Sequence, residues 1–261
     1  MAHETVKLAV ADGAARITLN RPDTLNAWNA QFGRDLLEVV EQVAGDEAVR
    51  AVMVTGAGRA FSSGADLREQ RGDGGAPDLS RRLHELYHPI VVGIREMPKP
   101  VVAAVNGPAA GIGCSLALTC DLVVAAESAF FVLAFVNIGL VPDGGSTAIV
   151  PARIGAARAF EMALLGERVS SATALEWGLV NRVLPDADLE QATSLLLAHL
   201  AGGPTRAYAN AKRLLNRTLY PGLGDQLEAE AEAQREQGLT SDFIEGLMAF
   251  AEKRPPRFSG T

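Results

Sequence analysis

The sequence is poor in cysteine and lacks any long, uninterrupted hydrophobic run. Two of its 261 residues are cysteines, Cys114 and Cys120. They have neither the spacing of metal ligands nor a neighbouring cluster of cysteine and histidine, so we expect two small buried side chains and no metal site. The N-terminus shows no basic segment followed by an apolar one, and the apolar stretches are too short to span a membrane. We therefore expect a cytoplasmic protein that has no membrane partner.

The chain also has fewer basic residues than acidic ones. The 31 aspartate and glutamate residues outnumber the 24 lysine and arginine residues, which gives a net charge of −7. A surface of this sign does not favour nucleic acid as a partner. A site for a polyanion such as a nucleotide cofactor would have to be local, built from backbone amides and a few cations.

The chain does contain enough apolar residues for one large core. Hydrophobic residues make up 48% of it, and its charged residues are spread along the chain. Strand-like and helix-like patterns alternate: we expect strands at 6–10, 15–19, 51–55, 100–105 and 121–125, and helices at 29–43, 79–96 and 109–119. Asp12-Gly13 between the first two strands predicts a hairpin. This alternation predicts an α/β class with parallel strands buried between helices.

The last third of the sequence has a different pattern. From Ala156 onward it is almost entirely helical, with Pro204 at one helix start and Ser241 as the expected N-cap of the last helix. We divide the chain into a core, residues 1–200, and a C-terminal helical region, residues 201–261. A helical region after an α/β body indicates a lid or an oligomerisation layer.

Several motifs occur in one order along the chain. They are Asn20-Arg21-Pro22 with Leu25-Asn26-Ala27, Arg59 to Leu67, Lys99-Pro100-Val101 with Asn106 to Gly111, Cys120-Asp121, Ile138 to Gly145, Ala174 to Val180, and Phe243 to Phe258. Together they resemble the enoyl-CoA hydratase/isomerase (crotonase) superfamily from end to end of the chain. The run from Phe131 to Phe135, followed by Gly139 to Asp143, closely resembles the phenylacetate-pathway isomerase subgroup.

The resemblance implies a fold and a ligand. The fold is a spiral of strand–strand–helix (ββα) turns, whose C-terminal helices pack subunits into a homotrimer or a dimer of trimers and form a lid. The ligand is an acyl-CoA, in which coenzyme A is part of the substrate thioester rather than a permanently bound cofactor. The pattern of residues agrees with an α/β body and a helical C-terminus, but it does not by itself produce the spiral.

The resemblance also implies an oxyanion hole. Chemistry on such thioesters forms an enolate, whose oxygen needs preorganised hydrogen-bond donors. By position, the family's two backbone N–H donors fall on Ala65 and Ile112. Ile112 lies near the start of an expected helix, where free N–H groups favour an anion. Taken alone, the same glycine-rich segments would be read as tight turns.

The acid–base residues favour an isomerase. Hydratases of the family use two glutamates, and this chain has Ser115 and Phe135 at those positions. Asp143 is the remaining carboxylate at a family-relevant position, and related isomerases carry an aspartate there. One carboxylate is enough to carry a proton between C4 and C2 while the oxyanion hole holds the dienolate. Without the resemblance, Pro-Asp-Gly would be read as a turn.

Further residues are expected to contact the substrate. The resemblance places backbone contacts to coenzyme A at Ala27, Ser63, Ala65 and Leu67, and brings Phe250 and Lys253 from the C-terminal helices. Lys253 can pair with a phosphate or, as a simpler alternative, stabilise the end of its helix. The complete expected substrate-binding set is Ala27, Ser63, Asp66, Leu67, Gly111, Phe135, Pro142, Phe250 and Lys253.

Three other functions stay open at this point. The first is an enoyl-CoA hydratase that uses Asp143 with an unusual water geometry. The second is an aryl-CoA dehalogenase, in which His88 and Asp143 would take part; the family's dehalogenases have tryptophan where Phe135 stands, so this match is partial. The third is a non-catalytic subunit that binds a CoA thioester.

Overall fold

The computed structural model describes residues 3–68 and 78–261. Its chain begins with the expected hairpin, in which β1 (Val6–Ala11) pairs antiparallel with β2 (Ala14–Leu19). Asp12 and Gly13 connect the strands with φ values of 50° and 76°. Positive φ at both turn residues is the geometry that an Asp-Gly pair favours in a two-residue hairpin.

The main sheet has six strands in the order β1-β2-β3-β4-β6-β9. The added strands are β3 (Ala51–Gly56), β4 (Val101–Val105), β6 (Leu122–Ala126) and β9 (Arg182–Leu184). From β2 onward every neighbouring pair is parallel. β4 is buried along its whole length, as expected for a strand with covered faces.

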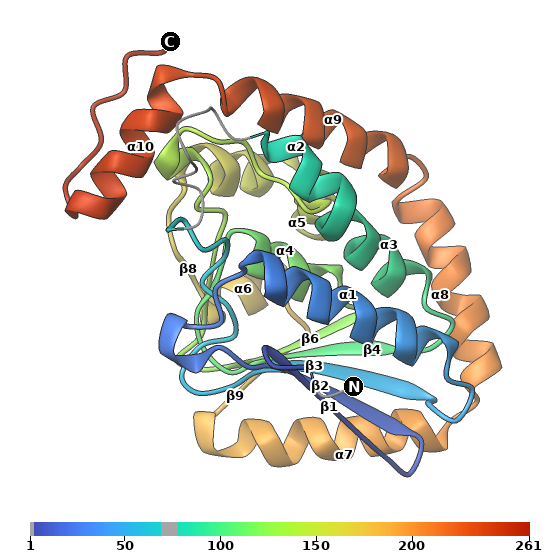
Figure 1. Ribbon diagram of the computed structural model, residues 1–261. Coiled ribbons are helices and arrows are strands. Elements are labelled where there is room, and N and C mark those ends of the chain that lie inside the picture. The colour runs from blue at the N-terminus through green and yellow to red at the C-terminus, as the bar shows by residue number, and fades with distance from the viewer. Residues whose placement is uncertain (1–2, 69–77) are drawn as a thin grey trace.

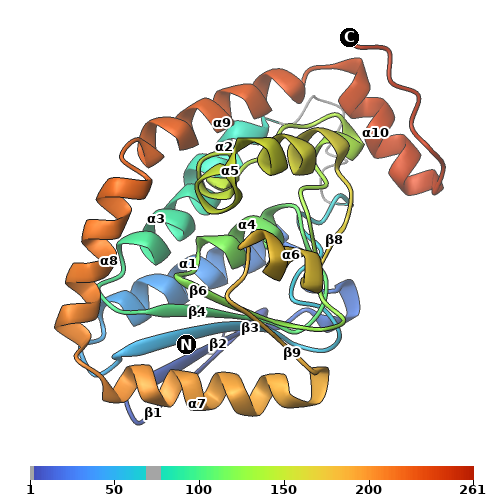
Figure 2. The ribbon, with the colours of Figure 1, turned by 180° about the vertical axis from the view of Figure 1, so that it is seen from behind.

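Helices lie on both sides of this sheet (Figures 1 and 2). On one side α7 (Leu189–Gly202) packs across β2, β3, β4 and β6. On the other side lie α1 (Ala30–Gly45), α3 (His88–Glu96) and α4 (Ile112–Thr119). The side chain of Asn29 caps α1 by accepting a 2.8 Å hydrogen bond from the Phe32 N–H.

A second, smaller sheet has the order β5-β7-β8. Its strands are β5 (Ala109–Ala110), β7 (Phe130–Val132) and β8 (Val169–Ser170). The chain passes from β4 through β5 into α4, and then from β6 through β7 towards α5 (Ser146–Leu165). Each pass places one strand in each sheet before a helix, which is the strand–strand–helix spiral that the family resemblance implied.

Four sequence-based expectations need correction. The helix expected at 109–119 begins at Ile112, because Ala109 and Ala110 pair with β7. The helix expected at 79–96 is divided into α2 (Leu79–Arg82), a π-helical turn (Leu83–Tyr87) and α3. The last third is not purely helical, since it contains β8 and β9. Thr240 rather than Ser241 caps the last helix, through the Phe243 N–H.

The remaining helices complete the chain. They are α6 (Ser171–Trp177), α8 (Thr205–Leu219), α9 (Leu223–Gln237), α10 (Ser241–Glu252) and 3-10 turns at Pro22–Thr24, Val136–Ile138 and Asp186–Asp188. In both ribbon views α8 and α9 run along the outside of the core, and α10 extends from it (Figures 1 and 2). No helix within residues 3–68 and 78–261 is long and apolar enough to cross a membrane.

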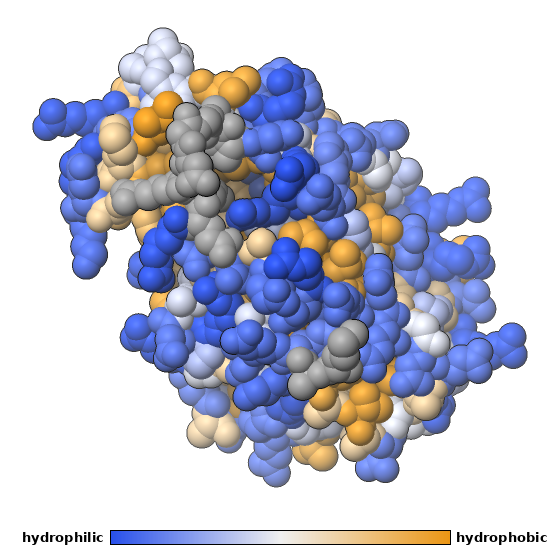
Figure 3. Space-filling view, viewed as in Figure 1, coloured by the Kyte–Doolittle hydropathy of each residue, from blue (hydrophilic) through white to orange (hydrophobic). Residues whose placement is uncertain are grey.

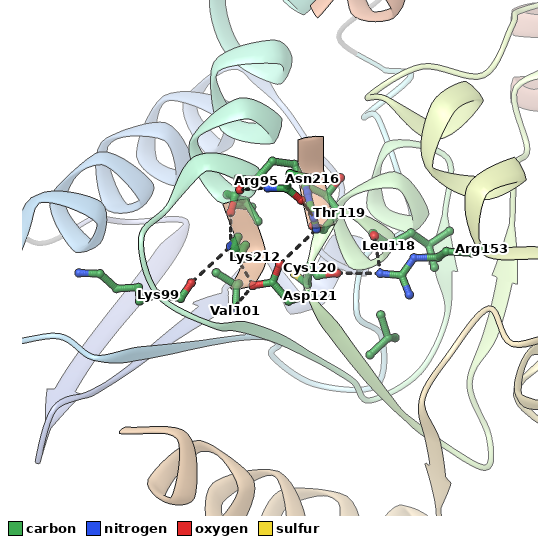
Figure 4. Close-up of polar contacts among 12 residues, drawn as sticks. Arg95, Lys99, Val101, Leu118, Thr119, Cys120, Asp121, Arg153, Lys212 and Asn216 are labelled. Atoms are coloured by element: carbon green, nitrogen blue, oxygen red, sulfur yellow. Dashed lines mark hydrogen bonds and ion pairs between the residues drawn. The ribbon is translucent and has the colours of Figure 1, made fainter. Parts of the chain in front are cut away.

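Buried charges anchor α8 to the core (Figure 4). Lys212 on α8 places its ammonium 2.8 Å from the carboxylate of Asp121, which precedes β6. The same carboxylate accepts hydrogen bonds from Arg95 and from the Val101 N–H. Asp121 is thus a structural hydrogen-bond partner that holds α8 against the core.

Candidate active site

A cavity of about 570 Å³ lies between the core and the C-terminal helices. That size is within the range of small-molecule sites. Its wall combines the segment after β2, the segment after β3, the α2 helix with its π-helical turn, the start of α4, residues 134–143, and one side chain each from α9 and α10. Apolar residues such as Leu79, Leu83, Tyr87 and Ile138 form much of this wall.

Two glycine-containing segments meet at the cavity. Ser62 and Ala109 form a parallel bridge, and the Ala110 N–H donates a 2.9 Å hydrogen bond to the Ser62 carbonyl. At Gly64, whose φ is +91°, a Cβ would lie 2.9 Å from the Ala110 carbonyl oxygen. Gly111 has φ +52°, and a Cβ there would lie 3.8 Å from the Gly64 Cα. Glycine at position 64 therefore lets the two backbones approach closely, and glycine at position 111 permits the positive φ.

The residues that follow these glycines each offer a free N–H group. Trp28 pairs with the backbone on either side of Ala65, through the Gly64 carbonyl and the Asp66 N–H. The Ala65 N–H between them donates no hydrogen bond to the described residues. Ile112 is the first residue of α4, so its N–H has no partner within the helix. Both residues line the cavity, where their N–H groups can stabilise a developing oxyanion.

Asp143 lies in the same cavity wall but is 4% exposed. Gly144 and Gly145 follow it with φ values of 66° and 78°, and they turn the chain into α5. Oδ2 of Asp143 accepts a 2.8 Å hydrogen bond from Nε2 of Gln234. Oδ1 is buried and has no hydrogen-bond partner among the described residues. One carboxyl oxygen is thus held by the protein while the other is left for a ligand or a proton.

Burial raises the pKa of Asp143 to about 8. The nearby carboxylate of Glu230 raises this pKa further, and the hydrogen bond from Gln234 opposes the rise. A carboxyl group with a pKa in this range can both take up and release a proton near neutral pH, as an acid–base catalyst must.

Two residues of this site were missed by the sequence analysis, and both lie on α9. Gln234 is 1% exposed and donates to the Val141 carbonyl as well as to Asp143. Glu230 is 3% exposed and accepts hydrogen bonds from the Gly145 and Thr147 N–H groups at the start of α5. Neither residue belongs to a motif, and the helical spacing of α9 did not indicate what its buried polar face would contact.

Two other carboxylates line the cavity, and each has a structural partner. Asp66 accepts hydrogen bonds from the guanidinium of Arg21 at 3.2 Å. Asp78 caps α2 by accepting from the Ser80 and Arg81 N–H groups, and its hydrogen bond with the Ser80 side chain lowers its pKa. Among the described acidic residues of the cavity wall, Asp143 is therefore the one with a buried carboxyl oxygen that has no hydrogen-bond partner.

Most of the residues expected at the site lie together. The cavity wall contains Ala27, Ser63, Ala65, Asp66, Leu67, Gly111, Ile112, Phe135, Asp143 and Phe250. Two expected contacts do not reach it. Pro142 is half-buried beside Asp143 without lining the cavity, and Lys253 is exposed. Lys253 ends α10 in the left-handed conformation, with φ 55°, so within this chain it is a helix-terminal residue.

His88 also lies outside the cavity wall. Its neighbour Tyr87 lines the cavity, whereas the His88 ring is directed towards Glu228 on α9, with 3.9 Å between Nδ1 and a carboxylate oxygen. Ser115, at one of the two hydratase glutamate positions, is completely buried behind the wall. Phe135, at the other position, does line the cavity.

The two-sheet spiral, together with a cavity lined by Ala65, Ile112 and the buried Asp143, is the arrangement expected of the crotonase class. The family model for enoyl-CoA hydratase/isomerase matches residues 10–261. The chain belongs to the enoyl-CoA hydratase/isomerase family, which confirms the resemblance carried by the motifs.

Individual relatives align over nearly the whole chain. A Rhodobacter capsulatus protein named "probable enoyl-CoA hydratase" is 44% identical over 100% of both chains. The 1,2-epoxyphenylacetyl-CoA isomerase of Escherichia coli K12 is 42% identical over 96% of this chain and 97% of its own. A crystal structure of an enoyl-CoA hydratase from Mycobacterium avium subsp. paratuberculosis superimposes with a TM-score of 0.90, at 40% identity and 98% coverage of each chain.

Proposed function

We propose that this enzyme is an acyl-CoA isomerase in which Asp143 is the acid–base catalyst and the Ala65 and Ile112 N–H groups form the oxyanion hole. The observation that carries the proposal is the state of Asp143: buried in the cavity wall, with one oxygen unpartnered and a pKa raised to about 8. The reaction is the shift of a double bond between 3-enoyl-CoA and 2-enoyl-CoA, or the isomerisation of a ring epoxide.

The double-bond shift needs one group that moves a proton. From a 3-enoyl-CoA, the Asp143 carboxylate takes a proton from C2, and the electron pair moves into the thioester to give a dienolate. The two N–H groups stabilise the negative oxygen of that dienolate. Asp143 then returns the proton at C4, which leaves the double bond between C2 and C3. The reverse reaction moves the proton from C4 to C2.

The structure gives less support to hydration. Water addition in this family uses two glutamates, and Ser115 and Phe135 occupy their positions. Ser115 is completely buried, and its hydroxyl donates to the Asp143 carbonyl, so it is not available to position a water molecule in the cavity. Phe135 is an apolar part of the wall. Water activation would therefore depend on Asp143 alone.

The dehalogenase alternative depended on His88, and its position does not support that function. A histidine that assists a nucleophilic aspartate must reach the substrate, whereas His88 does not line the cavity. An experiment can distinguish the non-catalytic alternative from an isomerase. A non-catalytic binding protein would be stabilised by a CoA thioester but would not convert the thioester to a product.

The protein is also proposed to assemble as a homotrimer or a dimer of trimers. α10 carries Ile244, Met248 and Phe250 with exposed fractions of 55%, 44% and 61%. Hydrophobic residues gather at the upper left of Figure 3, where α10 lies in the matching ribbon view. An exposed apolar cluster of this kind is typical of a subunit interface. Light scattering should give a mass of three or six times 27.4 kDa.

The proposed reaction is tested with a 3-enoyl-CoA and, separately, with a 2-enoyl-CoA in water. An isomerase converts the first with a rise in the ultraviolet absorbance of the conjugated thioester and no change in mass. A hydratase would instead add the mass of water to the second. The Asp143→Asn variant should bind the thioester but lose about 10²-fold to 10⁴-fold in kcat. Asp225→Asn, which changes an exposed carboxylate of α9, is the matched control.

A further inference from the structure

Two histidines and a glutamate meet outside the cavity. His84 and His88 lie four residues apart on the helical segment that forms one cavity wall, and Glu228 comes from α9. Nε2 of His84 is 3.0 Å from one Glu228 oxygen, and Nδ1 of His88 is 3.9 Å from the other. One ligand atom from each side chain lies within 4.8 Å of the other two.

The environment of His88 is unusual for a buried polar side chain. Its side chain is 8% exposed, and Nε2 is buried without a hydrogen-bond partner among the described residues. Nδ1 is too far from Glu228 for a hydrogen bond. Buried polar groups are nearly always partnered, so both nitrogens of this imidazole lack, among the described residues, the hydrogen bond that they would normally make.

The local backbone brings the two histidines to one side of the segment. Leu83–Tyr87 forms a π-helical turn between α2 and α3, and such turns are common at functional sites. The two imidazole rings are 5.4 Å apart with nearly perpendicular planes, at an interplanar angle of 87°. α2 packs directly against α9, which brings the Glu228 carboxylate to the same place (Figure 1).

We propose that His84, His88 and Glu228 form a binding site for a divalent transition-metal ion of the Zn²⁺ type. Two imidazoles and one carboxylate are a donor set that suits Zn²⁺ and its neighbours, whereas Mg²⁺ and Ca²⁺ prefer oxygen ligands alone. Three protein ligands leave a fourth position for water. The sequence predicted no metal site, because its cysteines lack the spacing of metal ligands and have no histidine cluster beside them. Glu228 lies 144 residues from His84, so local spacing does not indicate this cluster.

The present geometry is close to that of a metal site. Adjacent ligand atoms around tetrahedral Zn²⁺ are about 3.4 Å apart, given metal–nitrogen distances near 2.0–2.1 Å. The three ligand atoms here are up to 4.8 Å apart, so at least one side chain must move inward. His84 and Glu228 have exposed fractions of 46% and 68% and can do so, while His88 is fixed by burial.

An ion at this site would join α9 to the cavity wall. The helical segment with His84 and His88 also carries Leu83 and Tyr87, which line the cavity. α9 carries Gln234, which holds the Asp143 carboxyl group. The ion is therefore expected to stabilise the helices that enclose the active site without contacting the substrate.

The test is a titration of the whole protein, free of any histidine tag, with Zn²⁺ by calorimetry and with Co²⁺ by visible absorption. The wild type should bind one ion per chain, and its Tm should rise with the Zn²⁺ concentration. His84→Ala and Glu228→Gln remove exposed ligands, so both variants should fold. Each should weaken binding by at least about tenfold, the factor that loss of an outer-shell partner typically costs, and should reduce the Tm rise at a given Zn²⁺ concentration.

Two matched variants control for adventitious binding. His199→Ala removes an exposed imidazole from α7, and Glu236→Gln removes an exposed carboxylate from α9. Both should bind Zn²⁺ as the wild type does. Absence of binding in the wild type, or equal binding by His84→Ala and the wild type, would overturn the proposal. Neither result bears on the isomerase activity, which is measured separately.

Discussion

The hydroxyl group of Ser115 donates a 2.8 Å hydrogen bond to the backbone carbonyl of Asp143. A residue at a position where hydratases of the family have a catalytic glutamate therefore supports the backbone of the proposed acid–base. Ser146 donates to the same carbonyl, also at 2.8 Å. The carbonyl is thus held from α4 and from α5 together, which fixes the turn that presents the Asp143 side chain to the cavity.

Replacing Ser115 by alanine should weaken this support without removing it. We expect Ser115→Ala to lose about 1 kcal/mol of unfolding free energy, the usual net contribution of one hydrogen bond, because the Ser146 hydroxyl still satisfies the carbonyl. The kcat should fall several-fold at most. Urea unfolding together with steady-state kinetics measures both effects. A loss of activity as large as that of Asp143→Asn would show that Ser115 has a direct part in the reaction.

Gln234 is expected to be a positioning residue for Asp143. Its Nε2 donates to the Asp143 carboxylate, and this bond lowers the pKa of that group. Gln234→Leu should therefore move the pH midpoint of kcat/KM upward and reduce kcat, with a smaller effect on KM. The matched control is Gln226→Leu, on the same helix, whose side chain donates to Thr147 instead. An unchanged midpoint in Gln234→Leu would contradict this role.

The pH profile of the wild type separates the two forms of the proposed reaction. A double-bond shift begins with Asp143 as a carboxylate, so kcat/KM should rise with pH through a midpoint near 8. Ring-epoxide isomerisation that begins with proton donation to the epoxide oxygen needs the protonated form, so kcat/KM should fall through the same range. Profiles on a 3-enoyl-CoA and on a ring-epoxide thioester can be compared in one buffer series, and Asp143→Asn should remove the dependence in both.

Much of the fold followed from local patterns in the sequence. Asp12-Gly13 between two strand-like runs predicted the β1–β2 hairpin, and the buried run before Asn106 predicted β4. β5 and β8 have two residues each, too few for any periodicity to register, so the sequence patterns did not reveal the second sheet. The resemblance to a family supplied the spiral that periodicity could not.

The site was predictable in its backbone parts and less so in its side-chain contacts. The expected roles of Ala65 and Ile112 came from the family resemblance, because the glycine-rich segments alone indicate only tight turns. The contact between Gln234 and Asp143 joins residues 91 positions apart. A glutamine on a helix carries no signal of its partner, and its role depends on how α9 packs over the cavity.

The raised pKa of Asp143 should make the stability of the protein depend on pH. In the unfolded chain this carboxyl group titrates near 3.8, whereas in the folded protein it titrates near 8. Between these values the folded state holds a proton that the unfolded state has released, so its contribution is present at low pH and is lost as pH rises to about 8. The loss is on the order of 1 kcal/mol per pH unit in that window.

Asp143→Asn isolates this effect, because asparagine has a similar shape and does not titrate. Unfolding free energies of both proteins should be measured at pH 5.5 and at pH 8, with the difference between proteins taken at each pH. We expect the variant to gain stability relative to the wild type as pH rises, since titrating groups that do not interact with Asp143 cancel in the comparison. Glu230, whose pKa burial also raises, is present in both proteins, and its interaction with Asp143 is part of the measured difference. A difference that stays constant between the two pH values would mean that Asp143 is ionised throughout, and a base with so low a pKa would be poorly matched to the proton transfer proposed for it.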